Sequence, residues 1–107
     1  MKFRVGIIGC GRMASTIEDE VQGLQRGGLI LPYCHAGGYI EVEETEMVAA
    51  CDIAKDKLNA FTERWNVPRG YNDFRQLIDK EKPDILSITT RPEQHAEAMI
   101  YGAENGV

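Results

Sequence analysis

The sequence has no apolar run approaching the roughly 20 consecutive residues that a membrane-spanning helix needs, so we expect no membrane partner. Its first residues, Met-Lys-Phe-Arg-Val, place charge before apolar side chains as a signal peptide does. However, Arg12 interrupts the short apolar stretch where a cleavage region should begin. We therefore interpret this start as a buried strand that leads into a turn.

Basic charge is scarce in this chain. Twelve Lys and Arg residues stand against seventeen Asp and Glu residues, which gives a net charge of −5 over 107 residues. Such a chain repels the phosphate backbone of nucleic acids, so we expect no nucleic-acid partner. A dinucleotide remains possible, because the N-terminus of a helix attracts phosphate locally whatever the net charge.

Cysteines are few, and no CxxC pair occurs among Cys10, Cys34 and Cys51. The odd count does not indicate a disulfide framework, and we interpret these residues as reduced thiols of a cytoplasmic protein. A zinc site made of Cys34, His35 and Cys51 would lack a fourth ligand at a suitable spacing, so we expect no metal. The phosphate-binding motif GxxxxGK[ST] is also missing, which excludes a P-loop.

What is present is an alternation of strand and helix patterns. Short β-branched and apolar runs predict strands near residues 3–8, 46–51, 69–71 and 84–89, and apolar residues at spacings of three and four predict helices at residues 12–25 and 55–65, after Asp73 and from Pro92 onwards. This alternation predicts an α/β fold: a doubly wound parallel sheet of the Rossmann type with strand order 3-2-1-4. No residues remain for a fifth and a sixth strand, so we expect residues 1–107 to form an incomplete N-terminal dinucleotide-binding domain, without a C-terminal substrate domain.

Two segments carry weaker signals. Residues 29–45 contain Pro32, Gly37 and Gly38 and show no sustained periodicity, which predicts a loop with a short helix at residues 36–42. In the last helix we expect a buried stripe formed by four apolar residues: Ala96, Met99, Ile100 and Ala103.

The motif G-x-G-x-x-A follows the first strand and opens the first helix, as Gly9, Gly11 and Ala14. In a dinucleotide-binding turn the first glycine permits the tight turn, the second lets the backbone approach a pyrophosphate, and the small third residue lets the helix pack close to the strand. The free N–H groups near Arg12 and Met13 would then face the phosphates.

Asp52 stands at the end of the second strand, where an acidic side chain can accept hydrogen bonds from the hydroxyls of the adenosine ribose. Its charge would repel a 2′-phosphate, which favours NAD over NADP. Asp52 lies 38 residues after Ala14, against about 20 in the usual unit, and the segment 29–45 accounts for the excess. Asp52 could instead be an ordinary N-cap for the next helix, and one side chain could do both.

Three stretches of the sequence together resemble the Gfo/Idh/MocA family, which includes glucose–fructose oxidoreductase and inositol dehydrogenase. They are residues 4–14 (RVGIIGCGRMA), residues 47–52 (MVAACD) with the later YNDF at 71–74, and residues 84–95 (DILSITTRPEQH). The resemblance implies an NAD-dependent oxidoreductase that transfers hydride between the cofactor and a hydroxyl-bearing carbon of a sugar or polyol.

The resemblance also implies roles for individual residues. By position, Gly9, Gly11, Arg12 and Met13 would line the pyrophosphate and Asp52 would hold the adenosine ribose. Residues beside the nicotinamide-side ribose would be Thr89, Thr90, Pro92 and His95. Arg91 departs from the small residue, proline or asparagine that the family often has there. His95 could instead face solvent or bond a nearby carbonyl.

The family's catalytic lysine lies in a Glu-Lys-Pro motif beyond the next strand, and the resemblance therefore implies no catalytic residue in this chain and no activity of the chain alone. Glu81-Lys82-Pro83 matches the motif by letter, but it precedes the fourth predicted strand and is interpreted as a turn. His35 could reach the substrate if its loop folds over the cofactor, or it could lie in a surface loop.

Two further functions remain open at this point: a module that binds NAD without catalysis, and a Rossmann-like domain without a ligand. The uncharged run Ile85-Leu86-Ser87-Ile88 would form a sheet edge. Such an edge is a template for pairing with another chain, so we expect a homo-oligomer.

Overall fold

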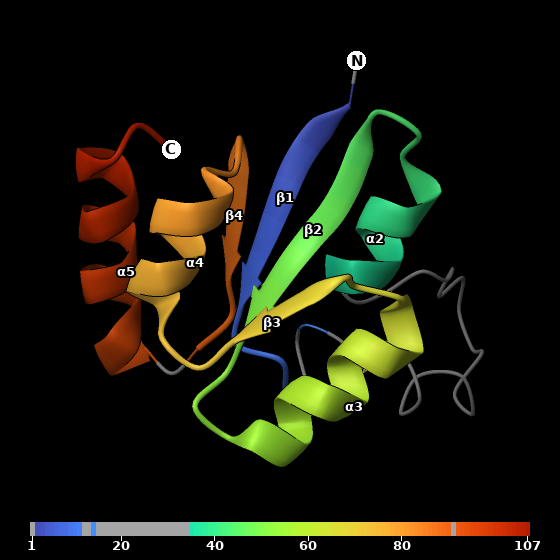
Figure 1. Cartoon of the computed structure of the whole chain (residues 1–107). Coiled ribbons are helices and arrows are strands. Elements are labelled where there is room, and N and C mark those ends of the chain that lie inside the picture. Colours follow the sequence, from blue (N-terminus) through green and yellow to red (C-terminus); the bar gives the residue numbers. More distant parts are fainter. Residues whose placement is uncertain (1, 12–13, 15–34, 91) are drawn as a thin grey trace, which may run out of the picture.

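The computed structural model describes residues 2–11, 14, 35–90 and 92–107. Within these residues, strands and helices alternate after the first strand (Figure 1). The elements are β1 (Phe3–Ile8), α2 (His35–Glu41), β2 (Thr45–Cys51), α3 (Lys55–Trp65), β3 (Arg69–Tyr71), α4 (Phe74–Glu81), β4 (Ile85–Ile88) and α5 (Pro92–Glu104).

The four strands form one parallel sheet in the order β3-β2-β1-β4, which confirms the predicted fold class and strand order. β1 lies between β2 and β4, with Ile8 paired to Cys51 on one side and to Ile88 on the other. Because all strands run in the same direction, their carboxyl ends meet at one edge of the sheet. The residues that follow the strands are therefore brought together there.

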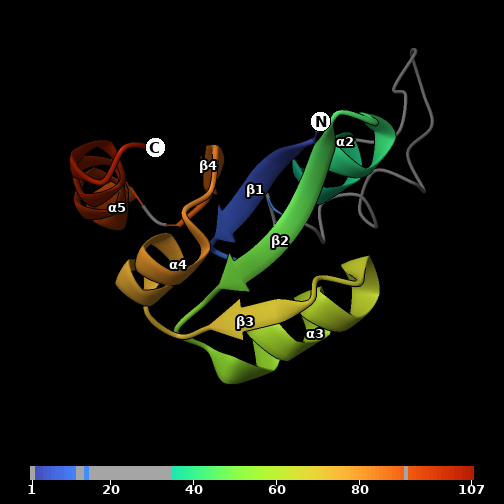
Figure 2. The same cartoon turned by 45° about the horizontal axis from the view of Figure 1, so that its top comes forward.

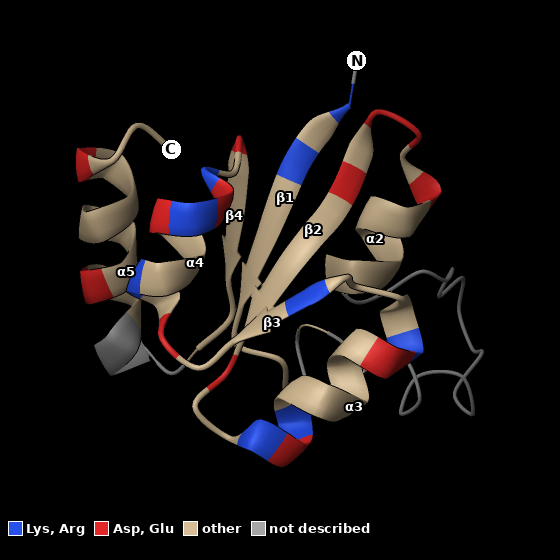
Figure 3. Cartoon of the chain, viewed as in Figure 1, with Lys and Arg blue, Asp and Glu red and all other residues tan. Residues whose placement is uncertain are grey.

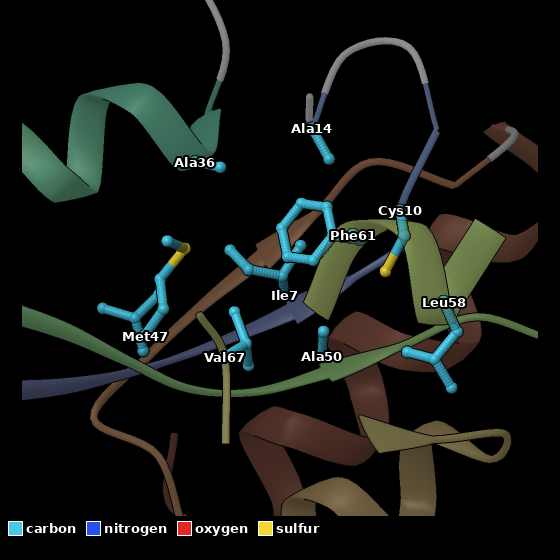
Figure 4. Packing of buried hydrophobic residues seen from close by; sticks show 10 residues of the cluster. Ile7, Cys10, Ala14, Ala36, Met47, Ala50, Leu58, Phe61 and Val67 are labelled. Atoms are coloured by element: carbon cyan, nitrogen blue, oxygen red, sulfur yellow. The ribbon is translucent and has the colours of Figure 1, made fainter. Parts of the chain in front are cut away.

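The two faces of the sheet are covered by different helices (Figure 2). α2 and α3 cover one face, where Phe61 of α3 packs with Ile7 of β1 in a buried cluster (Figure 4). α4 and α5 cover the other face, where Leu77 and Ile78 pack against the opposite side of the strands. Strands covered on both faces are apolar almost throughout, which explains the continuous apolar runs of the sequence.

Local signals in the sequence set the ends of α4. The Asp73 side chain accepts a hydrogen bond from the N–H of Arg75 at 2.9 Å, so Asp73 is the N-cap of the helix predicted to follow it. The helix ends where Lys82 adopts a left-handed conformation with φ of 45°. Glu81-Lys82-Pro83 is thus the end of a helix and the turn before β4, as the sequence analysis predicts.

The segment that separates the glycine-rich turn from β2 contains α2, one residue earlier than the predicted helix at residues 36–42. Its Ala36 is fully buried in the same cluster as Ile7. The helix predicted at residues 12–25 lies outside the described residues except for Ala14, which is also fully buried. In the part of the chain that the structure describes, no helix is both long and apolar enough to cross a membrane.

The predicted buried stripe of α5 is wrong. Ala96 and Ala103 are exposed, and Met99 and Ile100 are 60% and 59% exposed. The helix instead buries its small residues Ala98 and Gly102. At Gly102 an added Cβ would come 2.9 Å from Leu86 Cδ1 of β4, so the close approach of α5 to the sheet requires a small residue there. The prediction placed the larger apolar side chains in the buried face because they are more hydrophobic. The short distance between α5 and β4 leaves room only for smaller residues there.

Candidate functional site

A groove of about 760 Å³ lies at the carboxyl ends of the strands, within the size range of small-molecule sites. Its lining comes from the turn after β1, the end of β2 with the start of α3, the start of α4, the end of β4 and α5. The described lining residues are Ile8, Gly9, Gly11, Cys51, Asp52, Ile53, Ala54, Lys57, Asn72, Asp73, Phe74, Arg75, Thr89, Thr90, Glu97 and Ala98.

A glycine is required at position 9 by the conformation and packing of the protein, independently of any ligand. Its φ of 97° is a conformation that L side chains rarely adopt. An added Cβ would also lie 2.9 Å from the backbone carbon of Thr89 and from the backbone nitrogen of Thr90. The bare Cα of Gly9 therefore lets the turn after β1 pack directly against the end of β4.

Gly11 is a different case, because the part of the chain that the structure describes does not fill the space beside it. An added Cβ would meet no atom of the described residues within 4 Å, and Gly11 lines the groove. The backbone at this point is thus open to a group that approaches from the groove. This is the opening that a pyrophosphate would need beside the turn, so the residues present fit a dinucleotide.

Asp52 is held by backbone N–H groups on both sides. Its Oδ2 accepts a hydrogen bond from the N–H of Cys10 at 2.9 Å, and its Oδ1 accepts one from the N–H of Ala54 at 2.8 Å. Ala54, not Asp52, is the N-cap of α3. Asp52 therefore does not fill the N-cap role considered as an alternative. Each oxygen keeps a further lone pair for a ligand hydroxyl.

The end of β4 also contacts the glycine-rich turn. The N–H of Thr89 donates to the carbonyl oxygen of Ile8 at 2.8 Å, which extends the sheet by one residue. The Thr89 hydroxyl donates to the carbonyl oxygen of Gly9 at 2.7 Å. Thr90 follows at the rim of the groove. The turn after β1 is thus tied to both neighbouring strands.

The other predicted site residues are His95 and Pro92 in α5, and Arg12 and Met13 in the glycine-rich turn. His95 donates a hydrogen bond from Nε2 to the carbonyl oxygen of Thr90, because a carbonyl can only accept. It thus makes the carbonyl contact that was its structural alternative. Pro92 is the first residue of α5. His95 is not among the described lining residues, and Arg12 and Met13 lie outside the described part of the chain.

Two thiols lie beside the turn. Burial raises the pKa of Cys10 to about 12, and the nearby Asp52 carboxylate adds to the shift. Burial likewise raises the pKa of Cys51 to about 12. Both are free cysteines. Because their pKa values are raised, both thiols are neutral at ordinary pH, and a neutral thiol is a poor nucleophile. Among the described residues, no group of three His, Cys, Asp or Glu side chains is placed to hold a metal ion.

Charged and polar residues at the starts of the helices also line the groove, and they were not predicted from the sequence. Lys57 on the first turn of α3, together with Asn72 and Arg75 around the start of α4, lines the groove. Each lies within a few residues of the carboxyl end of a parallel strand, and that position could have been used to find them. The Asn72 side chain also donates to the Asp52 carbonyl oxygen at 3.1 Å.

His35 contacts β4 from the face of the sheet that α2 covers. Its Nδ1 lies 3.2 Å from Ser87 Oγ, and the same Oγ lies 2.5 Å from the Tyr39 hydroxyl. Ser87 is buried, and both partners satisfy its hydroxyl. His35 is not one of the described residues that line the groove. The described contacts therefore give His35 a structural role at the start of α2.

Taken together, the parallel sheet, the open glycine turn and the acidic residue after β2 define a dinucleotide-binding Rossmann domain. The sequence profile of the oxidoreductase family with an NAD-binding Rossmann fold, Gfo/Idh/MocA, matches residues 3–107. The chain therefore belongs to this family, as its sequence motifs indicate.

Individual relatives are distant and longer than this chain. It is 25% identical over 104 residues to the D-glucoside 3-dehydrogenase of Escherichia coli, a match that covers 97% of the chain and 25% of that protein. It is 26% identical over 101 residues to the inositol 2-dehydrogenase of Salmonella typhimurium, covering 94% of the chain and 25% of that protein. The chain thus spans about a quarter of the length of the relatives it matches.

Solved structures support the same fold. The scyllo-inositol dehydrogenase of Lactobacillus casei, solved with NAD(H) and scyllo-inositol, superposes with a TM-score of 0.72 at 15% identity over 99% of this chain and 26% of that one. An oxidoreductase of Agrobacterium radiobacter, solved with NAD+, L-tartaric acid and magnesium, superposes with a TM-score of 0.74 at 20% identity over 100% of this chain and 26% of that one. The family is NAD-binding, and NAD is the cofactor that this site fits.

Proposed function

We propose that this chain is the NAD-binding portion of a dehydrogenase that transfers hydride between NAD and a hydroxyl-bearing carbon of a sugar- or polyol-like substrate. The family match and the dehydrogenase relatives support the reaction class. The observation that carries the cofactor assignment is the open backbone at Gly11, beside Asp52 in one groove.

In this proposal the groove orients the cofactor from end to end. Gly9, Gly11, Arg12 and Met13 line the pyrophosphate, and Asp52 receives the hydroxyls of the adenosine ribose. Beside the nicotinamide-side ribose we place the end of β4 and the start of α5, with Thr89, Thr90, Pro92 and His95. Bound NAD would supply the hydride acceptor, and this chain's residues would hold and orient it.

Asp52 would set the preference for NAD over NADP. Its carboxylate can accept hydrogen bonds from the ribose hydroxyls, but it repels a 2′-phosphate. The experiment is calorimetric titration of the chain with NAD and with NADP, for the parent and for Asp52→Ala. We expect Asp52→Ala to weaken NAD binding and to reduce the difference in affinity between NAD and NADP. The matched control is Asp56→Ala, which removes the same charge from an exposed position in the first turn of α3 that is not among the described lining residues of the groove.

Unchanged affinities for both cofactors in Asp52→Ala would remove the ribose role. If the parent chain binds neither NAD nor NADH, the proposed function fails as a whole. We also propose that the 107 residues alone do not turn over any polyol. Hydride transfer needs a base near the alcohol and groups that fix the substrate against the nicotinamide ring, and we assign neither to a residue of this chain. We also propose that the protein is cytoplasmic and that it forms a homo-oligomer.

A further inference from the structure

One peptide group in the glycine-rich turn is held at both of its ends. This group joins Gly9 and Cys10. Its carbonyl oxygen accepts the Thr89 hydroxyl at 2.7 Å, and its N–H donates to Asp52 Oδ2 at 2.9 Å. Thr89 follows β4 and Asp52 follows β2, so the two contacts reach the same peptide from the two strands that flank β1.

The two contacts together fix the plane of this peptide. In a trans peptide the C=O and the N–H point in opposite directions, so a bond at one end alone would still allow the plane to tilt. We propose that Asp52 and Thr89 form a two-sided clamp that orients the Gly9–Cys10 peptide, and through it the N–H of Gly11, for the pyrophosphate. This role rests on the proposed function for its ligand, but the clamp itself rests on contacts within the protein.

The clamp decides which N–H of the turn is left for phosphate. The N–H of Gly9 donates to the Cys51 carbonyl oxygen at 2.8 Å, and the N–H of Cys10 donates to Asp52. The next one along the chain, that of Gly11, has no acceptor among the described residues and lies where the backbone is open to the groove. The peptide that carries the Gly11 N–H begins at the Cα of Cys10, so holding the Gly9–Cys10 peptide fixes one end of it.

The clamp requires a carboxylate at residue 52. Both Asp52 oxygens face backbone N–H donors, those of Cys10 and Ala54. An asparagine would offer one acceptor and would place its NH₂ against the other N–H. Asp52→Asn keeps the shape and an acceptor for a ribose hydroxyl, yet it cannot satisfy both backbone groups. We therefore class Asp52 and Thr89 as positioning residues in addition to any direct contact with cofactor.

Thr89 allows the clamp to be tested against the role that the family resemblance implies. In the clamp Thr89 acts through the turn, whereas the resemblance implies direct contact with the nicotinamide-side ribose. ADP carries the adenosine and the pyrophosphate but lacks that ribose. If Thr89 acts through the turn, Thr89→Val weakens ADP and NAD by the same factor, which we expect to be at least fivefold. Thr89→Ser, which keeps the hydroxyl, restores both affinities. Thr62→Val is the matched control, because the Thr62 hydroxyl bonds within α3, to the Asn59 carbonyl oxygen.

A loss of NAD affinity with unchanged ADP affinity in Thr89→Val would overturn the clamp and support direct contact. Unchanged affinity for both ligands would also overturn it. A thermal melt of each variant shows whether it is folded, and Thr89→Ser keeps the comparison available if the valine variant is not. If the parent chain binds neither ADP nor NAD, the proposed function is contradicted. The clamp is then tested by amide hydrogen exchange alone.

Amide hydrogen exchange tests the clamp without a ligand. We expect the Cys10 N–H to exchange at least tenfold faster in Asp52→Asn and in Thr89→Val than in the parent, with the N–H of Ile7 in β1 as the internal reference. Because both variants release the same peptide, the double variant should exchange little faster than either single variant. Effects that multiply in the double variant, or an unchanged rate in both single variants, would overturn the proposal.

Discussion

At the scale of single residues, the two glycines of the turn have different tasks. Gly9 has a positive φ, and an added Cβ there would meet the backbone of Thr89, whereas an added Cβ at Gly11 would meet no atom of the described residues within 4 Å. We predict that Gly9→Ala lowers the free energy of unfolding by about 2 kcal/mol or more. Gly11→Ala should leave it within about 0.5 kcal/mol, yet raise the Kd for NAD by about tenfold or more.

Chemical denaturation and calorimetric titration of the two variants measure both quantities. The interpretation of Gly11 fails if Gly11→Ala binds NAD as tightly as the parent chain. The interpretation of Gly9 fails if its alanine variant is as stable as the parent.

A second residue-scale feature is the buried carboxylate of Glu81, at the end of the sheet opposite the groove. Its side chain is 5% exposed. Oε1 accepts from Arg4 at 3.0 Å and from Arg69 at 2.8 Å, Oε2 accepts from the Tyr71 hydroxyl at 2.6 Å, and Arg69 Nε makes a further contact with Oε2. The hydrogen bonds from Arg69 hold the pKa of Glu81 below its ordinary value, and those from Tyr71 add to this.

Because the pKa of Glu81 is lower in the folded than in the unfolded state, its stabilisation is present above about pH 4.3, the unfolded value. It is lost as the pH falls through the folded value. We predict that Glu81→Gln lowers the free energy of unfolding at pH 7 by about 1–3 kcal/mol, and that this difference narrows as the pH is lowered towards 3. Urea denaturation at both pH values measures it, with the exposed Glu63→Gln as control.

A difference between parent and Glu81→Gln that is the same at both pH values would contradict the ionised cluster.

The sequence predicted the groove residues that belong to a motif, because a motif fixes both residue type and spacing. Gly9, Gly11 and Asp52 lie together as expected. Contacts between segments far apart in the chain were beyond its reach: no local pattern joins Thr89 to Gly9, which are 80 residues apart. The same holds for the bond between Asp52 and the N–H of Cys10.

At the scale of elements, the strands were the most predictable. β1 has the predicted bounds, because a β-branched run that ends in glycine has few alternatives. The third predicted helix was located by its N-cap, Asp73. The buried face of α5 was not predictable from apolar periodicity, because its contact with β4 is too close for large side chains.

The corrected face of α5 leads to a prediction. Met99 and Ile100 are exposed, so Met99→Gln and Ile100→Gln should each change the free energy of unfolding by less than about 0.5 kcal/mol. Ala98 is 1% exposed, and Ala98→Gln should cost about 2 kcal/mol or more, because a longer polar side chain is forced into a filled space. Thermal and urea denaturation of the three variants measure this. A larger loss from Met99→Gln than from Ala98→Gln would restore the face expected from the sequence.

At the scale of the whole molecule, β4 is one edge of the described sheet. β4 pairs with β1 on one side, and within the described residues no strand pairs with its other side. It carries no charge along its length (Figure 3). Met99 and Ile100 add exposed apolar surface on α5, the helix that packs on β4. Both features favour contact with a second copy.

We therefore predict that the chain self-associates, most simply as a two-fold dimer. Light scattering over a concentration series should show a mass that rises from one chain towards two. The double variant Met99→Gln/Ile100→Gln is the comparison, because it removes the apolar face and leaves the edge intact. A constant monomer mass at high concentration, together with a cooperative melt, would contradict the exposed-edge argument.

The central claim is that NAD binds at the carboxyl ends of the strands, with its pyrophosphate against the turn after β1. The most direct measurement is a titration of isotope-labelled chain with NAD, followed by amide NMR shifts. The account predicts shifts concentrated at residues 9–11, 52–54 and 89–90, with the amides around Arg4 and Glu81 at the opposite edge unchanged. Shifts centred on that opposite edge, or no shifts at saturating NAD, would contradict it.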